Sequence, residues 1–550
     1  MTYRAADALA DALVAHGVDR AFGVPGESFL AALDALLDRP QIDLVTCRHE
    51  GAAALAAVAD ARLCGAPGVL FVSRGPGMAN ATIGVHVAQQ DALPLVVFVG
   101  QVDRPLLGRG AFQEVDYRRM YGGVAKLVAE VMQADRMSAT IAQAFSIAQS
   151  GTPGPVIVVL PEDVLSEACA AVATRPLGGS RPKPSTDDVA AVAALIAQSR
   201  RPVVIVGAES RSPAFRADLR RFSERWQLPV AVTNKNQDQF ANEHPNWLGH
   251  LGFFVSPPLS ALLAEADLVL AIGTRLGDVT SQGYTFPRQA PAPQTLVHVY
   301  PDGAAMATQF RTERAIVSGA HAFVQAMLDA PPAGAPARHD WLAQSAQARD
   351  QARAWSPQAT PPADVFGHVV QAIATRLAPD AIVTLDAGNF STWPHRLLSL
   401  RPAQTMLAAA CGAMGMGVPA ALAAALRHPG RQVIAFCGDG GYLMTGNELA
   451  TIVGRGLAPK IVVANNRSYG TIRSYQERQY PRRVNGTDLN NPDFAMLAAA
   501  YGAGGFRVSA AGEAEAVVAE MLAHPGPALL EVVCDIEQIM AGTTLSAIRP

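Results

Sequence analysis

The chain has 550 residues, of which half are hydrophobic and 17% are charged, and its formal net charge at pH 7 is −3. This length exceeds what one hydrophobic core supports, so we expect three domains with large cores. The nearly balanced charge excludes the strongly basic surface typical of proteins that bind nucleic acid. Six cysteines without a Cys-x-x-Cys pair argue against a disulfide framework or a structural zinc site, and they fit a reducing compartment.

One segment imitates a membrane span. Residues 405–426 carry no charge and reach the length that a spanning helix needs. However, the segment contains Gly412, Gly415, Gly417 and Pro419, so we interpret it as a buried loop that enters a core helix. The first residues of the chain also lack the apolar core of a signal peptide. We therefore expect a cytoplasmic protein without a membrane partner.

Short apolar strands alternate with alanine-rich helical stretches in residues 1–172. The predicted strands include residues 70–72, 95–99 and 156–160. Such alternation is typical of a parallel sheet covered by helices on both faces. The first segment is therefore predicted to form a doubly wound α/β domain.

The same alternation returns twice after breaks that are rich in proline. Residues 173–187 read as a linker, and a second α/β domain is predicted over residues 188–330. The proline- and alanine-rich run 331–362 is the second predicted boundary, and the third domain covers residues 363–550. The predicted fold class is thus α/β, with three doubly wound parallel-sheet domains.

The most informative motif is Gly438-Asp439-Gly440, which follows an apolar run at 433–436. A second apolar run, 461–463, leads into Asn465-Asn466, and the stretch 442–457 between the two runs has helical character. Both runs read as buried parallel strands, so the acid and the amide lie at the strand ends where open parallel sheets bind ligands. Glycines let a backbone approach a diphosphate closely, and carboxylate and amide oxygens suit Mg²⁺. We therefore predict a diphosphate and magnesium site with Asp439 and Asn466 as metal ligands.

The Gly438-Asp439-Gly440 motif followed by Asn465-Asn466 resembles the signature of thiamine diphosphate (ThDP) enzymes. The rest of the chain also resembles that superfamily, most nearly its acetolactate synthase group. The resemblance implies a pyrimidine-binding domain, a middle domain and a diphosphate-binding domain, in that order. It also implies that the backbone carbonyl of Ser468 completes the metal shell. The cofactor-binding residues that it implies are Pro25, Gly26, Asn80, Gly388, Asn389, Gly412, Met414, Gly438, Gly440, Gly441 and Tyr469.

Glu50 follows a predicted strand at 42–45 and resembles the catalytic glutamate of the superfamily. In that superfamily the glutamate hydrogen-bonds N1′ of the aminopyrimidine, so that the 4′-nitrogen takes the proton from C2 of the thiazolium. A largely apolar pocket raises the pKa of such a carboxyl group. The alternative is a dipole or capping role at the start of a helix. The motifs on either side favour catalysis.

The resemblance to the acetolactate synthase group also assigns roles in the active site to four further residues. Phe112 would bound the substrate alkyl group, and the Gln113 amide would contact the developing alkoxide or the cofactor. Tyr475 aligns with an aromatic residue that shapes the second-substrate pocket. Met414 matches the residue that wedges between the two cofactor rings, which is catalysis by positioning. The plain alternatives are a core Phe, a surface Gln and a core Met.

Four stretches depart from the acetolactate synthase pattern. Residues 275–279 read Arg-Leu-Gly-Asp-Val in place of the FAD-linked Arg-Phe-Asp-Asp-Arg, which makes FAD doubtful. Residues 252–254 replace Met-His-Gly, and residues 386–390 replace Val-Gly-Gln-His-Gln. Arg74 stands where a small hydroxyl residue is usual. It either clamps a substrate carboxylate or faces solvent or a partner subunit.

The leading hypothesis is ThDP- and Mg²⁺-dependent decarboxylation of a small-molecule 2-oxo acid, most simply pyruvate, with ligation of the resulting enamine to a second carbonyl compound. A non-oxidative 2-oxo acid decarboxylase or a 2-hydroxyacyl lyase stays open. A flavin-dependent oxidase of the pyruvate oxidase type and a non-catalytic binding protein are less favoured. Because ThDP sites pair Glu50 of one subunit with Asp439 of the next, the resemblance implies at least a homodimer, and a homotetramer is common in the family. A regulatory subunit and a place in branched-chain amino acid biosynthesis are left open.

Overall fold

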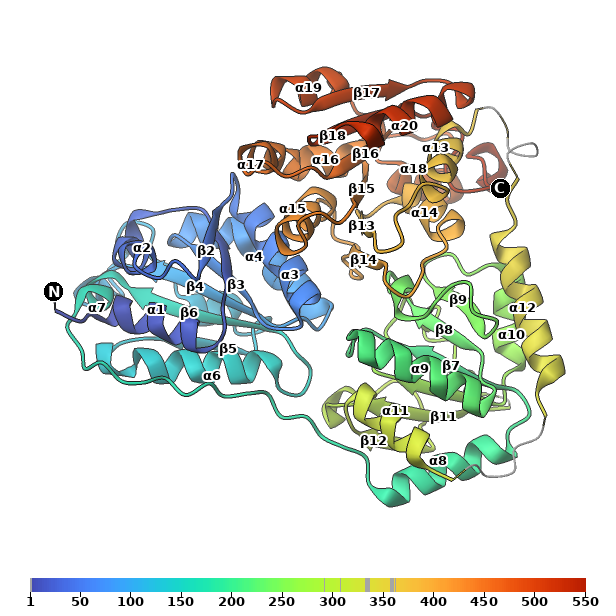
Figure 1. The fold of residues 1–550 in the computed structure, drawn as a ribbon, viewed down its shortest axis with the longest axis horizontal. Coiled ribbons are helices and arrows are strands. Elements are labelled where there is room, and N and C mark those ends of the chain that lie inside the picture. Colours follow the sequence, from blue (N-terminus) through green and yellow to red (C-terminus); the bar gives the residue numbers. More distant parts are fainter. Residues whose placement is uncertain (1, 291, 307, 332–336, 357–360, 362) are drawn as a thin grey trace.

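A computed structural model describes residues 2–550 except 291, 307, 332–336, 357–360 and 362. The chain forms three parallel sheets of six strands each, and helices cover both faces of each sheet (Figure 1). Each sheet comes from one successive part of the chain. The predicted fold class, three doubly wound α/β domains, is therefore confirmed.

The first sheet has the strand order β2-β1-β3-β4-β6-β5. Its strands are β1 (Arg20–Gly23), β2 (Asp43–Thr46), β3 (Gly68–Val72), β4 (Leu95–Gln101), β5 (Leu127–Glu130) and β6 (Pro155–Pro161). The helices of this domain are α1 (Ala5–Ala15), α2 (Leu30–Leu37), α3 (Glu50–Cys64), α4 (Gly75–Gln90), α5 (Tyr117–Tyr121), α6 (Met137–Gln149) and α7 (Glu162–Ser166). Strands β3, β4 and β6 are buried along their whole length, which explains their uninterrupted apolar sequences.

The third sheet repeats the topology of the first, with the order β14-β13-β15-β16-β18-β17. Its strands are β13 (Ile382–Leu385), β14 (Thr405–Ala408), β15 (Val433–Gly438), β16 (Lys460–Asn465), β17 (Gly504–Val508) and β18 (Ala528–Val533). Its helices are α13 (Val365–Ala374), α14 (Thr392–Leu397), α15 (Gly417–Arg427), α16 (Asp439–Thr445), α17 (Leu449–Gly454), α18 (Gly470–Gln479), α19 (Phe494–Ala500) and α20 (Ala514–Ala523). The two outer domains therefore present their strand ends in the same way.

The middle sheet has a different order, β12-β11-β10-β7-β8-β9. Its strands are β7 (Pro202–Val206), β8 (Val230–Thr233), β9 (Trp247–Leu251), β10 (Leu268–Ile272), β11 (Thr295–Tyr300) and β12 (Arg314–Val317). Its helices are α8 (Thr186–Gln198), α9 (Pro213–Trp226), α10 (Pro257–Glu265) and α11 (Ala320–Asp329). This order is the one found in dinucleotide-binding folds, where ligands bind between the first and fourth strands, here β7 and β10.

Two predicted segments differ in detail from the structure. The run 331–362, read as a boundary, contains helix α12 (His339–Arg353), although part of the run lies outside the described residues. Trp341 of α12 is buried and donates a hydrogen bond from Nε1 to the carbonyl of Pro202 at 2.8 Å, so this helix packs on the middle domain. The helical stretch predicted after Gly441 divides into α16, the 3₁₀ helix η7 (Gly446–Glu448) and α17.

The segment that imitates a membrane span is a core element, as predicted. It forms strand β14, a glycine-rich loop and helix α15, whose residues are buried from Gly417 to Ala425. Across the part of the chain that the structure describes, no helix is both long and apolar enough to cross a bilayer.

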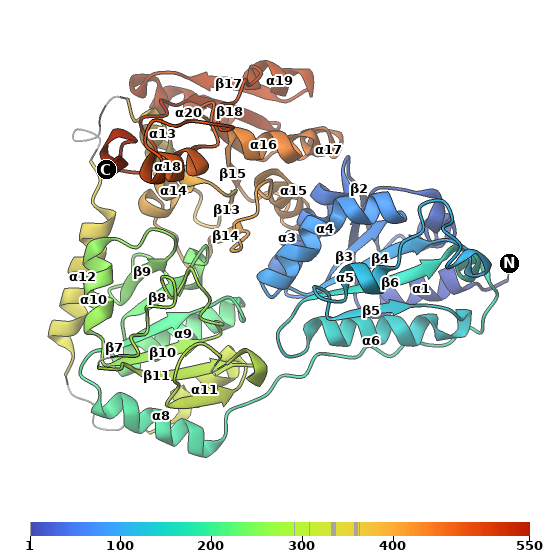
Figure 2. The same ribbon diagram turned by 180° about the vertical axis from the view of Figure 1, so that it is seen from behind.

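Helix α15 packs against α3 where the first and third domains meet (Figures 1 and 2). Both helices are rich in buried alanine, so their backbones approach closely. Arg427 at the end of α15 binds the buried carboxylate of Asp60 in α3 at 2.6 Å. The middle domain lies beneath the third domain in both views.

Candidate functional site

A cavity of about 340 Å³ lies between the third and middle domains. It opens at the carboxyl ends of β13, β15 and β16 on one side and of β8 and β9 on the other. This is the edge at which parallel sheets bind ligands. Twelve of the sequence-predicted site residues line it: Gly388, Asn389, Gly412, Met414, Gly438, Asp439, Gly440, Gly441, Asn466, Ser468, Tyr469 and Tyr475.

The turn from β15 into α16 leaves no room for side chains at two glycines. A Cβ atom on Gly440 would lie 2.5 Å from the Tyr469 ring, and one on Gly441 would lie 2.5 Å from the Asp386 carboxylate. Glycine therefore keeps the backbone of this turn open to the cavity, where a diphosphate can approach the peptide N–H groups. The glycines fit the group that the resemblance implies.

Asp439 supplies a buried carboxylate at the same turn. Its Oδ1 accepts a hydrogen bond from the Gly440 N–H at 2.9 Å, and its Oδ2 accepts one from the Asn491 amide at 2.8 Å. Burial raises the pKa of Asp439, so a nearby cation would stabilise its ionised form. Asn466 Oδ1 accepts a hydrogen bond from the Ser468 N–H at 3.0 Å, which fixes the turn after β16.

The oxygen atoms of Asp439, Asn466 and the Ser468 carbonyl are of the kinds that bind Mg²⁺ and would supply part of a metal shell. The described residues contain no group of three or more His, Cys, Asp or Glu side chains that would hold a metal alone. One carboxylate, one amide oxygen and one backbone carbonyl are hard oxygen ligands that suit Mg²⁺ when diphosphate oxygens complete the shell.

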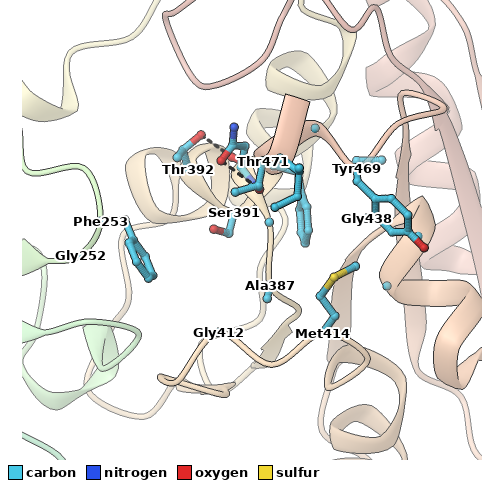
Figure 3. A pocket seen from close by; sticks show the side chains of 18 of the residues that line it. Gly252, Phe253, Ala387, Ser391, Thr392, Gly412, Met414, Gly438, Tyr469 and Thr471 are labelled. Atoms are coloured by element: carbon cyan, nitrogen blue, oxygen red, sulfur yellow. Dashed lines mark hydrogen bonds between the residues drawn. The ribbon is translucent and has the colours of Figure 1, made fainter. Parts of the chain in front are cut away.

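Met414 belongs to the cavity and not to the core. It is half-buried and its side chain projects into the pocket (Figure 3), whereas Met416 is only 1% exposed and packs in the core. Asp386 holds this loop, because its Oδ1 accepts hydrogen bonds from the N–H groups of Ala387 at 2.7 Å and Gly415 at 2.8 Å. Met414 therefore lines the cavity, and its role as a wedge between the cofactor rings stays a prediction.

Asn389 lines the cavity, but its polar atoms are engaged by helix α18. Its N–H donates to Thr471 Oγ1 at 3.0 Å, and Thr471 Oγ1 donates to Asn389 Oδ1 at 3.1 Å. Asn389 thus ties the loop after β13 to the helix that carries Tyr475. Phe390 belongs to the same stretch, 386–390, that differs from the acetolactate synthase pattern, and it lines the cavity as an apolar residue.

The middle domain contributes residues that the sequence reading did not select. They are Asn234, Lys235 and His250, and His395 joins them from α14 of the third domain. Phe253 and Phe254, which also line the cavity, were noted only as a departure from the family pattern. The available signal was the polar run that begins at Asn234, directly after the apolar strand β8. The rings of His250 and His395 stack at 4.4 Å. Burial lowers the pKa of both, to about 4 for His250, so both imidazoles are neutral at pH 7.

The predicted residues of the first domain form a separate cluster that does not line this cavity. The Asn80 amide donates to Glu50 Oε2 at 2.9 Å, and the Gly75 N–H donates to the Gln113 carbonyl at 3.2 Å. A Cβ on Gly26, which follows Pro25, would lie 2.5 Å from the Ser73 side chain beside Gly75. The predicted site residues of the first domain therefore lie close to one another, apart from those that line the cavity.

Two further first-domain residues have contrasting surroundings. The Phe112 side chain is 76% exposed, which is unusual for so large an apolar residue. Arg74 is buried and donates to Glu162 at 2.7 Å, with Glu27 at 3.6 Å. Its guanidinium is thus engaged by two carboxylates of its own domain.

The loops that follow the neighbouring strands β7 and β10 carry a carboxylate, Glu209. A Cβ on Gly207 would lie 2.1 Å from the Gly273 carbonyl oxygen, so the loops after the two strands are in backbone contact. Glu209 Oε2 accepts a hydrogen bond from the Ala320 N–H at 2.7 Å, at the start of α11. This half-buried carboxylate would repel the pyrophosphate of a dinucleotide bound at the same point.

Comparisons with known proteins agree with this arrangement. The family described as "Thiamine pyrophosphate enzyme, N-terminal TPP binding domain" matches residues 3–120. The central domain of the same enzymes matches residues 189–327, and their C-terminal TPP binding domain matches residues 386–532. The three matches follow the order of the three sheets.

Individual relatives match over nearly the whole chain. An acetolactate synthase large subunit from Parasynechococcus marenigrum is 34% identical, covering 96% of this chain and 87% of the relative. The acetolactate synthase isozyme 2 large subunit from Escherichia coli is 31% identical over 95% and 94%, and a probable acetolactate synthase large subunit from Methanocaldococcus jannaschii is 31% identical over 97% and 92%. The chain therefore belongs to the thiamine pyrophosphate-dependent enzymes and is similar throughout to acetolactate synthase large subunits.

Proposed function

We propose that this enzyme uses ThDP and Mg²⁺ to decarboxylate a 2-oxo acid, most simply pyruvate, and to ligate the remaining fragment to a second carbonyl compound. The observation that carries this proposal is that the diphosphate turn, Met414 and Tyr475 meet in one cavity. When bound, ThDP would supply a nucleophilic carbon and an electron sink for decarboxylation. All remaining tasks fall to the residues of the chain.

The third domain would hold the cofactor. Asp439, Asn466 and the Ser468 carbonyl would bind Mg²⁺, and the N–H groups of the glycine turn would bind the diphosphate. Met414, which projects into the cavity, would pack against the cofactor and position it for proton transfer. Gly388, Gly412 and Tyr469 line the walls around it.

A second copy of the chain would supply Glu50. Within one chain, Glu50 and Asn80 lie with Gln113 in a cluster away from the cavity, and Phe112 is exposed beside them. Pairing two copies would bring each cluster to the cavity of the other and cover Phe112. Glu50 would then exchange a proton with the aminopyrimidine nitrogen, and the Gln113 amide would stabilise developing alkoxide charge. We therefore propose at least a homodimer.

The proposed reaction uses no flavin. The Glu209 carboxylate, which lies beside the ends of β7 and β10, would repel the pyrophosphate of a dinucleotide there. The broken motif at residues 275–279 supports the same interpretation. This argues against an oxidase of the pyruvate oxidase type.

The apolar wall of the cavity also supports a second candidate function. Phe253 and Phe254 make part of the cavity wall apolar, which suits a non-oxidative decarboxylase or a lyase as well as a synthase. A pyruvate turnover assay with ThDP and Mg²⁺ separates them. Acetolactate that disappears in Glu50→Gln supports the synthase; acetaldehyde as the main product supports a decarboxylase; no CO₂ release contradicts pyruvate as the donor.

A further inference from the structure

A short segment between α18 and α19, residues 487–491, contacts both turns that carry the proposed metal ligands. We call it the bracing segment. One of these turns follows β15 and carries Asp439, and the other follows β16 and carries Asn466 and Ser468. The bracing segment therefore joins the two turns that a bound metal would also join.

The backbone of the bracing segment pairs with the turn after β16. The Tyr469 N–H donates to the Thr487 carbonyl at 2.8 Å. The Leu489 N–H donates to the Arg467 carbonyl at 2.8 Å, and Ser468 between them forms an antiparallel bridge with the segment. Arg467 has a φ of 54°, in the left-handed region that a non-glycine residue adopts only where its surroundings hold it. The pairing therefore fixes the peptide groups around the Ser468 carbonyl, the proposed backbone ligand.

The Asn491 side chain, at the end of the bracing segment, links the two strands that lead to the ligands. Its amide donates to Asp439 Oδ2 at 2.8 Å and to Asn465 Oδ1 at 2.9 Å. Asp439 directly follows β15, and Asn465 ends β16 immediately before Asn466. One side chain therefore ties the carboxylate ligand to the strand that presents the amide ligand.

The direction of these hydrogen bonds is set by charged residues that do not line the cavity. The buried Asn465 amide donates to Glu531 Oε1 at 2.7 Å, and Glu531 Oε2 accepts a hydrogen bond from Arg507 at 2.7 Å. A carboxylate paired with an arginine accepts and cannot donate, so Asn465 must turn its NH₂ group to Glu531 and its oxygen to Asn491. Asn491 must then turn its own NH₂ group to Asn465 and to Asp439.

We propose, resting on the Mg²⁺ site of the function proposed above, that Asn491 is a positioning residue that sets the affinity of this enzyme for Mg²⁺. Asn491 does not line the cavity, so it acts through Asp439 and Asn465. A carboxylate that an outer hydrogen bond already orients loses less freedom when a cation binds it. Because the Asn491 amide is neutral, it orients Asp439 without repelling the cation.

The test compares Asn491→Ala with the wild-type protein, by calorimetric titration of Mg²⁺ into metal-free protein in excess ThDP. The apparent Kd for Mg²⁺ should rise about 10- to 100-fold, the usual effect of removing an outer partner of a metal ligand. ThDP binding at saturating Mg²⁺ should equal that of wild type, because the metal ligands themselves remain. This separation between the two affinities would not result from general damage to the fold.

Asn490→Ala is the matched control. Asn490 is the neighbouring residue of the same type, and it is exposed. Its variant should bind Mg²⁺ as tightly as the wild-type protein does. Asn491→Leu is a second test variant, because it keeps most of the side-chain volume and removes the donors. It should weaken Mg²⁺ binding in the same way, and it replaces Asn491→Ala if that variant unfolds.

The outcomes separate the two proposals. A wild-type protein that binds no ThDP, or that binds it equally well without Mg²⁺, contradicts the proposed function. A wild-type protein that binds both, together with an Asn491→Ala protein of equal Mg²⁺ affinity, contradicts only the assignment of Asn491. Weaker ThDP binding that saturating Mg²⁺ does not restore also overturns the assignment, because Asn491 would then affect more than the metal ligands.

Discussion

Glu448 of the third domain accepts hydrogen bonds from the backbone N–H groups of Arg48, at 2.8 Å, and His49, at 3.2 Å. These two residues immediately precede Glu50, which begins helix α3. Glu448 is fully buried and also accepts a hydrogen bond from Thr451 at 2.6 Å. A carboxylate of one domain therefore fixes the backbone that carries the proposed catalytic glutamate of another.

Replacing Glu448 by Ala should destabilise the protein by roughly 2–3 kcal/mol, because two buried N–H donors lose their acceptor. Activity should fall further than stability, since the start of α3 is no longer fixed. Thermal unfolding and turnover measure the two effects. Glu448→Gln is the control, because its amide oxygen still accepts both bonds; if it behaves like Glu448→Ala, the hydrogen bonds are not the cause.

Asp386 should make stability depend on pH. Burial raises the pKa of Asp386 from 3.8 to about 6, so the folded protein binds its proton more tightly than the unfolded chain. The associated stability is present below the unfolded pKa and is lost as pH rises through 6. In Asp386→Asn, which keeps the oxygen that holds the Met414 loop, this loss should disappear. Denaturant unfolding at several pH values between 4 and 7 measures it, and an identical pH slope in both proteins would refute the assignment.

Much of the fold could be predicted from the sequence, because its strands are buried on both faces and read as continuous apolar runs. The identical strand order of the first and third sheets could not, since order depends on which strands pair and not on their composition. Helix α12 was missed because prolines surround it and only its Trp341 face is apolar.

The candidate site divides in the same way. Asp439, Asn466 and Met414 were predicted and meet in the cavity, because each directly follows a strand or stands in a glycine-rich loop beside one. Lys235 and His395 come from different domains, 160 residues apart, and only tertiary packing brings them together. The roles predicted for Glu50, Phe112, Gln113, Arg74 and Tyr475 stay predictions.

The C-terminal segment should support the cavity through helix α18. Arg549 donates to Glu477 of α18 at 2.9 Å, and this bond is the main cause that lowers the pKa of Glu477 to about 2. Because α18 carries Ile472 and Tyr475 at the cavity wall, Arg549→Ala should raise the KM for the 2-oxo acid several-fold. Steady-state kinetics measure it, with Arg483→Ala as an exposed control. An unchanged KM would mean that the ion pair does not position α18.

The purified enzyme should contain no flavin. Its visible absorption spectrum should be featureless, and added FAD should change neither turnover nor unfolding temperature, because the Glu209 carboxylate beside the ends of β7 and β10 would repel the FAD pyrophosphate. Stoichiometric flavin released on denaturation would contradict this interpretation of the middle domain.

The most direct test of the account mixes two inactive variants, Glu50→Gln and Asp439→Asn, by coexpression. Each variant alone should have little activity, since each lacks one half of every site. If two copies complete each site, hybrid dimers contain one intact site, and random assembly should restore about a quarter of wild-type activity. A mixture that assembles into hybrids but stays as inactive as either variant would show that Glu50 and Asp439 act within one chain, and would contradict the composite site.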